Sequence, residues 1–128
     1  MAGYSDKPLI AKLGYQSGDS VYLYQAPEWF VQGLTAGSII STSTLPTTWA
    51  HLFVKNRKDL EQQISRIALD DIQKAIWISW PKKASKIPTD VTEQTLRDVV
   101  LALGWVDIKV AAVDGTWSGL KFSRRTHK

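Results

Sequence analysis

The segment Ala75–Trp80, with the sequence AIWISW, constrains the fold more than any other part of the chain. Nearly all of its residues are apolar, so a strand made from it would present apolar side chains on both of its faces. Such a strand is stable only when other elements cover both faces, because exposed apolar surface is unfavourable in water. We therefore expect Ala75–Trp80 to lie in the middle of a sheet that has helices on each side.

Strand-like runs occur on both sides of this segment. Their β-branched and aromatic residues favour strands. The runs before it are Ser20–Gln25, Ser38–Ser43 and Ala50–Val54, and those after it are Val106–Val113 and Thr116–Ser123. The last two runs are joined by Asp114-Gly115, a pair whose tolerance of positive φ favours a two-residue hairpin turn.

Helical spacing fills the gaps between these strands. A proline at the start and a glycine past the end favour a short helix over Pro8–Leu13. The segment Asn56–Gln73 begins with a good N-cap residue and has apolar residues on one face. A third helix is expected to begin near Val91, because Asp90 and Glu93 have capping-box spacing before an apolar stripe that a glycine ends.

The alternation of strands and helices predicts an α/β fold. Parallel strands joined by helical crossovers give a Rossmann-like sheet, and the final hairpin adds one antiparallel strand. We expect a three-layer α-β-α sandwich in a single domain of 128 residues, with a basic C-terminal tail from about residue 124. No internal repeat or linker interrupts it.

Composition excludes several classes of site. The chain has 0 cysteines, which excludes disulfides, thiolate metal sites and a cysteine nucleophile. No His, Asp and Glu cluster has metal-ligand spacing, and we expect no cofactor. No apolar run reaches the roughly 18 residues of a membrane helix, and the N-terminus lacks a signal-peptide core, so we expect a cytoplasmic protein without a membrane partner. The net charge of +4 permits weak attraction to phosphate-bearing partners.

The order of the expected elements resembles the fold of class I S-adenosylmethionine-dependent methyltransferases, most clearly from Thr48 onward. The resemblance implies that one strand–helix unit between Leu34 and Thr48 is shortened. The sequence departs from that family at the cofactor positions. The first strand leads into Gln25-Ala26-Pro27-Glu28-Trp29-Phe30, which has no glycine, lacks one amide donor at the proline and has a large indole where an adenosyl group needs space. The second strand ends at Ser41–Thr44 without a carboxylate.

Several short motifs resemble a family of small bacterial proteins, a domain of unknown function. They are Lys12-Leu13-Gly14, Gly18-Asp19, Ala26-Pro27-Glu28, Trp80-Pro81-Lys82-Lys83-Ala84-Ser85, Pro88-Thr89-Asp90 with Thr92-Glu93, and Val106-Asp107 and Lys109-Val110 through Ala112-Val113-Asp114 to Trp117-Ser118-Gly119-Leu120-Lys121-Phe122. The resemblance implies the fold and a bacterial source. It implies no established activity, so it transfers no catalytic residues.

The predicted fold brings three loops to one edge of the sheet. Ligands of parallel sheets bind beyond the carboxyl ends of the strands, and the loops after Gln25 and Trp80 and the hairpin turn all leave that edge. The N-terminus of the helix near Val91 opens beside them and adds a positive dipole. The candidate ligand-binding residues are Trp80, Pro81, Lys82, Lys83, Ser85, Thr89, Asp90, Asp114, Trp117 and Ser118.

Each candidate also has a structural interpretation. Lys82 and Lys83 are compatible with solvated loop charges, and Asp90 with a helix cap. Asp114 is compatible with a turn residue. His51 lies on an expected strand without a serine or aspartate at the spacing of a catalytic triad, which favours a structural histidine.

Three functional hypotheses follow. The first is a non-enzymatic protein that binds a small anionic ligand or an acidic partner segment at the carboxyl edge, with Lys82 and Lys83 as charge donors. The alternative is an S-adenosylmethionine-dependent methyltransferase, or another nucleotide-dependent enzyme, with a rebuilt cofactor site. The third is weak nucleic-acid binding through the lysine loop, the Arg124-Arg125 tail and exposed tryptophans. The exposed edge strand of the hairpin, Val106–Val113 or its partner strand, would also permit a homodimer.

Overall fold

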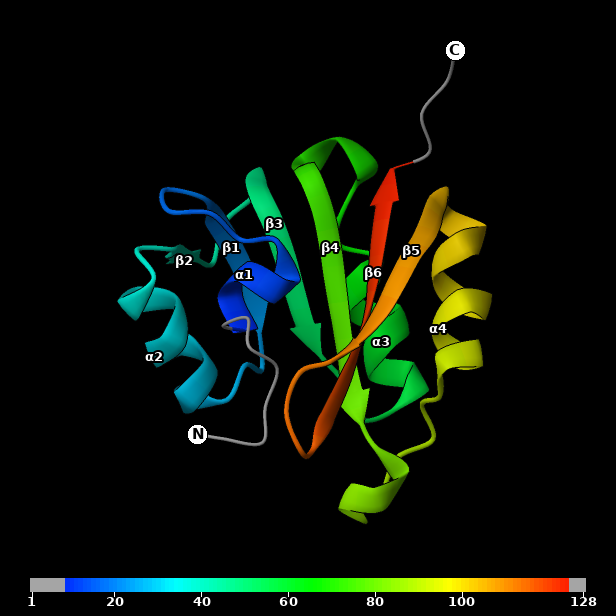
Figure 1. Ribbon diagram of the computed structural model, residues 1–128. Coiled ribbons are helices and arrows are strands. Elements are labelled where there is room, and N and C mark those ends of the chain that lie inside the picture. Colours follow the sequence, from blue (N-terminus) through cyan, green and yellow to red (C-terminus); the bar gives the residue numbers. More distant parts are fainter. Residues whose placement is uncertain (1–8, 125–128) are drawn as a thin grey trace.

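The apolar run Ala75–Trp80 forms most of the longest strand in the computed structural model, which describes residues 9–124 (Figure 1). The strands are β1 (Ser20–Tyr24), β2 (Ile40–Thr42), β3 (Thr47–Phe53), β4 (Ile72–Pro81), β5 (Trp105–Ala112) and β6 (Trp117–Arg124). The helices are α1 (Leu9–Leu13), α2 (Glu28–Ala36), α3 (Arg57–Ile64) and α4 (Glu93–Val100), with short 3₁₀ helices at Leu69–Asp71, Lys83–Ser85 and Leu101–Leu103.

All six strands belong to one sheet with the order β2-β1-β3-β4-β6-β5. The neighbours among β2, β1, β3 and β4 are parallel, and β6 is antiparallel to both β4 and β5. The hairpin therefore inserts one antiparallel strand between β4 and the edge strand β5. This confirms the mixed, mostly parallel sheet that the alternation of patterns predicts.

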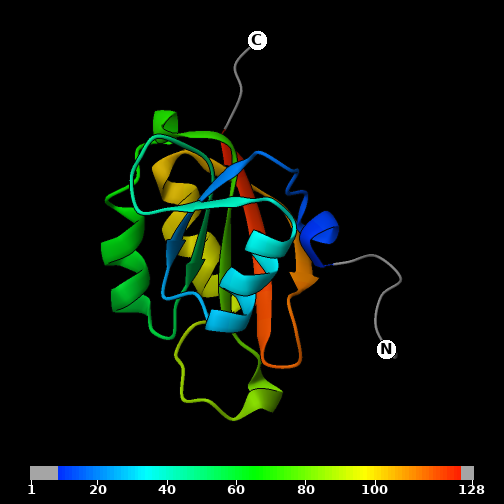
Figure 2. The same cartoon turned by 90° about the vertical axis from the view of Figure 1, so that its left-hand side faces the viewer.

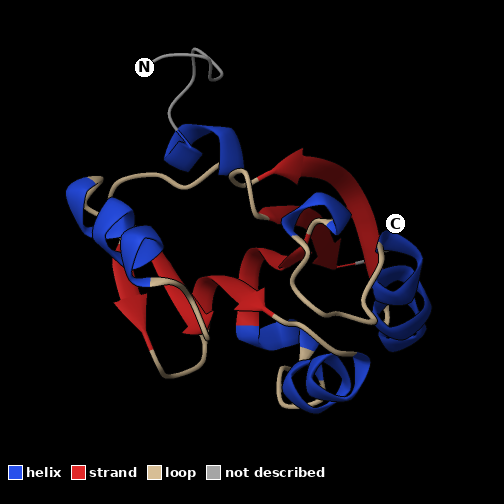
Figure 3. Ribbon diagram, turned by 90° about the horizontal axis from the view of Figure 1, so that it is seen from below, coloured by secondary structure: helices blue, strands red, loops and turns tan. Residues whose placement is uncertain are grey.

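Helices cover both faces of the sheet (Figures 2 and 3). On one face, apolar side chains of α3 and α4 pack against β3, β4 and β6 around the buried Trp105. On the other face, residues of α1 and α2, with Leu13, Phe30 and Leu34 at the centre, pack against β1, β3 and β4 around the buried Trp77. The three-layer sandwich is thus confirmed. None of the helices in the described part of the chain has the length and apolar character needed to cross a membrane.

Two helices differ from the expectation. The expected helix Asn56–Gln73 ends at Ile64, and Ile72 already belongs to β4. Of its apolar positions beyond Ile64, Ile67 is buried in the segment after α3 and Ile72 is buried in β4, whereas Ala68 is exposed. The helix α2 is not among the predicted helices. It forms because Phe30 and Leu34, four residues apart, both bury against the sheet.

One of the two predicted helix N-caps is confirmed, and the other is wrong. The Asn56 side chain accepts a hydrogen bond from Asp59 N at 2.8 Å, so the predicted cap of α3 is confirmed. The predicted cap of α4 is wrong, because Thr92, not Asp90, accepts from Thr95 N at 3.2 Å. Gly104, at a φ of +99°, ends the 3₁₀ extension of α4 as expected.

The hairpin turn also differs from the prediction. The residues between β5 and β6 form a longer loop, closed by a hydrogen bond from Val113 N to Trp117 O at 2.9 Å. Gly115 is not among the glycines with positive φ. Instead, the Asp114 carboxylate shapes the loop by accepting hydrogen bonds from Thr116 N at 2.8 Å and Trp117 N at 2.7 Å. Asp114 is therefore a turn residue, which is the structural interpretation that its position in the sequence allows.

Candidate functional site

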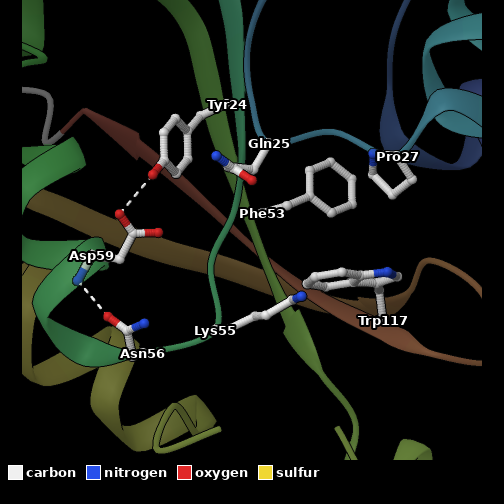
Figure 4. Close-up of a pocket in the computed structure, with 8 residues that line it drawn as sticks. All are labelled: Tyr24, Gln25, Pro27, Phe53, Lys55, Asn56, Asp59 and Trp117. Atoms are coloured by element: carbon white, nitrogen blue, oxygen red, sulfur yellow. Dashed lines mark hydrogen bonds between the residues drawn. The ribbon is translucent and has the colours of Figure 1, made fainter. Parts of the chain in front are cut away.

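The candidate site lies where the strand order reverses. From β1 the chain passes through α2 to β2 on one side, and its other neighbour in the sheet is β3. At such a switch point the connecting loops diverge and leave a crevice beyond the carboxyl ends of the two strands. A cavity of about 380 Å³ occupies this place. Its lining residues are Tyr24, Gln25, Pro27, Phe53, Lys55, Asn56, Asp59 and Trp117 (Figure 4).

Two aromatic rings form the apolar wall of the cavity. Phe53 is the last residue of β3, and Trp117 is the first residue of β6. Their ring centroids are 5.1 Å apart with an interplanar angle of 84°, the edge-to-face arrangement that aromatic pairs favour. Both side chains are largely buried, so the wall is fixed by core packing before any ligand arrives.

The opposite wall is polar and held by hydrogen bonds. The Tyr24 hydroxyl donates to Asp59 Oδ1 at 2.7 Å, as Figure 4 shows. The hydrogen bond to the Asp59 carboxylate is the main cause of a raised pKa for Tyr24, so the phenol stays a neutral donor. The Asp59 carboxylate is thereby partnered inside the wall.

Lys55 is the cation of the cavity lining, and it has no such partner. The residue is exposed and follows β3 by two positions. None of the carboxylates in residues 9–124 lies within 4.0 Å of its ammonium group. The cavity therefore offers a free positive charge beside two aromatic rings.

The turn after β1 is made without glycine. Gln25 takes the left-handed conformation, with a φ of 57°, that glycine adopts most easily. The absence of a glycine thus does not prevent the sharp exit from β1. The expectation that Trp29 fills the cofactor space is wrong, because Trp29 is 42% exposed and lines a separate hollow with Leu9 and Ile10 of α1.

The sequence-predicted residues around the end of β4 do come together. Trp80 pairs with Ser118 and Pro81 with Trp117, and Lys82 N donates to Thr116 O at 2.7 Å. Ser85 orders its own loop, because its hydroxyl donates to Lys82 O at 2.6 Å and accepts from Ile87 N at 3.2 Å. Of this group Trp117 lines the cavity, whereas Lys82, Lys83 and Ser85 do not. Anion binding by the two lysines stays a prediction.

Thr89 and Asp90 lie apart from that group, against the loop between β3 and α3. The Thr89 hydroxyl donates to Lys55 O at 2.6 Å, and Asp90 Oδ1 accepts from Arg57 N at 2.7 Å. Together with Ile87 and Pro88 they line a second, open hollow of about 500 Å³ that shares Lys55 and Asn56 with the first cavity. These two hydrogen bonds thus hold the loop that carries Lys55 against the Thr89–Asp90 segment.

Replacing Asp90 with Ala is expected to lower the free energy of unfolding by about 1 kcal/mol, since the first amide of α3 loses its carboxylate acceptor. Asp90→Asn keeps a side-chain oxygen and serves as the matched control, with a smaller loss. Urea titration measures both variants. Equal losses in the two would show that the charge, and not the hydrogen bond, is what Asp90 contributes.

Of the eight lining residues, only Trp117 is among the candidates that the sequence predicts, and Gln25 and Pro27 belong to a loop expected at this edge. The other five lining residues were missed: Tyr24, Phe53, Lys55, Asn56 and Asp59. Asn56 was assigned only to capping, and the loop after Val54 was not counted among those at the carboxyl edge. The sequence did contain a signal for these residues, because the loops after β1 and β3 directly follow neighbouring parallel strands. It becomes decisive only when the strand order is known.

Comparisons with known proteins relate the chain to a fold. No family model matches the sequence, and no curated protein matches it. Magnesium protoporphyrin IX methyltransferase from Synechocystis PCC 6803, solved with bound S-adenosylmethionine, has a TM-score of 0.59 at 8% identity over 91% of this chain and 74% of its own.

Two further solved structures are similar. A protein of the NADB-Rossmann superfamily from Streptococcus agalactiae has a TM-score of 0.55 at 6% identity, covering 98% of this chain and 71% of its own. LepI, solved with S-adenosylhomocysteine and a substrate analogue, has a TM-score of 0.53 at 12% identity, covering 91% and 39%. At these identities the likeness concerns the fold alone. The chain has a Rossmann-like, methyltransferase-like α/β fold.

Proposed function

We propose that this protein binds a small ligand carrying a flat ring and a negatively charged group in the cavity between the carboxyl ends of β1 and β3. The observation that supports it is the free Lys55 ammonium beside the Phe53–Trp117 wall, at the switch point of the sheet. A volume of about 380 Å³ is within the usual range of roughly 300–1,000 Å³ for small-molecule sites. The anionic group pairs with Lys55, and the ring lies against the aromatic wall.

The charge of the lining favours an anion over a cation. Asp59 is the carboxylate of the cavity, but it already accepts the hydrogen bond from Tyr24. A cationic ligand would therefore compete for a partnered carboxylate and meet the Lys55 ammonium. An anionic ligand meets a cation that has no carboxylate partner in the described chain.

Calorimetric titration with adenosine monophosphate, adenosine and inorganic phosphate tests this proposal. We expect adenosine monophosphate to bind most tightly, because it alone offers both groups. Lys55→Gln is expected to weaken its binding by about 10-fold or more, the effect of one charge-assisted hydrogen bond. Trp117→Leu is expected to weaken both adenosine monophosphate and adenosine. No heat with any probe would overturn the proposal.

A Lys82→Ala/Lys83→Ala double variant locates the anion. If the cavity is the site, the double variant binds adenosine monophosphate as the wild type does. If the double variant loses binding and Lys55→Gln keeps it, the anion sits on the loop after β4, as the sequence analysis expected. Thermal unfolding of each variant, which must match the wild type, excludes a loss caused by misfolding.

A second candidate function is S-adenosylmethionine-dependent methyl transfer. It is supported by two of the similar structures, which were solved with S-adenosylmethionine and S-adenosylhomocysteine. The sharp turn at Gln25 supports it further, because it leaves the end of β1 open without a glycine. Titration with both compounds in the same calorimetric series tests it. Binding of either compound, lost in Trp117→Leu, would support it, and no heat with either would remove it.

A further inference from the structure

Three lysines from three strands gather on the sheet face that carries α1. Lys109 of β5 and Lys121 of β6 are direct cross-strand neighbours. The ammonium groups of Lys121 and of Lys74, from the start of β4, lie 5.1 and 6.0 Å from the ring centre of Trp49. We call Lys74, Lys109 and Lys121 the lysine cluster.

This arrangement is unfavourable for the protein alone. Like charges placed directly opposite on antiparallel strands destabilise the pair. Burial, followed by the charges of Lys109 and Lys74, lowers the pKa of Lys121. Among the described carboxylates, Asp19 lies 3.6 Å from the Lys74 ammonium, and none lies within 4.0 Å of Lys109 or Lys121. The fold therefore holds Lys109 and Lys121 together without a carboxylate partner among the described residues, while Lys74 beside them pairs with Asp19.

The cluster is accessible from solvent. In Figure 1, β5 crosses in front of β6, and no described helix lies in front of either strand. Lys109 is exposed, the Lys74 side chain is 44% exposed, and Lys121 is half-buried. Lys121 lies over the rings of Trp49 and Trp77, so the indoles fix its position. Lys74 lies at the amino end of β4, so the cluster is separate from the cavity at the carboxyl ends.

We propose that the lysine cluster binds a ligand with several neighbouring phosphate groups. Cations on three adjacent strands match a multivalent anion better than a single carboxylate. Lys109 and Lys121 each offer a compact charge for one phosphate group, and Lys74, which pairs with Asp19, adds positive charge beside them. Binding relieves the repulsion between Lys109 and Lys121. The site is independent of the ring-and-anion site at Lys55, so either can fail without the other.

Thermal unfolding and calorimetry with sodium tripolyphosphate test the proposal. We expect tripolyphosphate to raise the Tm of the wild type by several degrees, because a ligand of the native state stabilises it by mass action. The variant Lys109→Gln/Lys121→Met is expected to bind at least about 10-fold more weakly. Methionine at 121 keeps an unbranched side chain over Trp49 while removing the charge. Lys58→Gln, on exposed α3, is the matched control and keeps the full Tm shift.

A second readout needs no ligand. In low salt Lys109→Gln is expected to raise the Tm of the free protein by about 1–4 °C, because the cross-strand repulsion is removed. The proposal is overturned if tripolyphosphate gives no shift, or if Lys58→Gln weakens binding as much as the cluster variant does. A single-stranded RNA that loses binding in the cluster variant would support the proposal and identify nucleic acid as the source of the phosphates.

Discussion

Between pH 6.5 and about pH 3 the protein is expected to lose about 1.4 kcal/mol of unfolding free energy per pH unit because of a single histidine. His51 of β3 is fully buried, and burial lowers its pKa from 6.5 to about 3. Its ring lies 2.8 Å from the Tyr15 hydroxyl and 2.7 Å from the Ser79 hydroxyl. The unfolded chain binds a proton near pH 6.5, whereas the native state does not bind it until about pH 3. Acid therefore favours unfolding throughout this window.

Urea titrations from about pH 7 to about pH 4.5 measure this dependence, and His51→Gln is the control. The control variant lacks the titrating ring, so its stability is expected to fall less with acid, by roughly 2.7 kcal/mol over two pH units. The carboxylates are the same in both proteins, so the difference between the two slopes isolates His51. Parallel slopes would show that the ring is already protonated in the native state.

The buried position of His51 also decides its role. Hydrogen bonds link the side chains of Ser79, His51 and Tyr15 in a row. The row contains a serine bonded to a histidine, a pair that occurs in nucleophilic catalysis. All three side chains are buried, with Ser79 and His51 at 0% exposure, so a substrate does not reach them. The structural interpretation of His51 is supported. The serine that the sequence analysis did not find lies 28 residues away and is brought to the ring by the pairing of β3 with β4.

The fold was predictable in those segments whose sequence pattern favours one kind of secondary-structure element. The run Ala75–Trp80 is short and apolar on both faces, a pattern typical of a central strand. The stripe of α4 ends at a glycine, so both its type and its end were readable. Prediction failed after Ile64, where the same apolar residues fit a helix or a turn and strand. The spacing of apolar residues does not distinguish a longer helix from a turn followed by a strand, because Ile67 and Ile72 can be buried in either structure.

The site was less predictable, because it depends on the strand order. The topology alone predicts Trp117 at the carboxyl edge of the sheet, and the structure places it in the lining of the cavity there. Lys55 and Tyr24 were not, because their loops meet only when β3 lies beside β1. Asp90 shows the same limit: its spacing to Glu93 predicts a cap for its own helix, yet the tertiary fold uses its carboxylate for α3.

Trp77 holds the α1 layer onto the sheet. Its side chain is fully buried, and its indole N–H donates to Leu13 O at 2.9 Å across 64 residues. Gly119 of β6 makes room for it, since a Cβ at that position would lie 3.2 Å from Trp77 Cε3. The glycine of the Trp117-Ser118-Gly119 motif thus has a packing reason. Removal of the indole leaves both a cavity and the Leu13 carbonyl without its donor.

Trp77→Ala is therefore expected to lower the free energy of unfolding by about 3–5 kcal/mol, the cost of a large buried aromatic side chain. Trp29→Ala is the matched control, because it makes the same chemical change at a side chain that is 42% exposed, and its loss is expected to stay near or below about 1 kcal/mol. Urea unfolding measures both, and Trp77→Phe provides a milder change if the alanine variant does not fold. A Trp77→Phe loss no larger than that of Trp29→Ala would show that α1 is held to the sheet by contacts other than this indole.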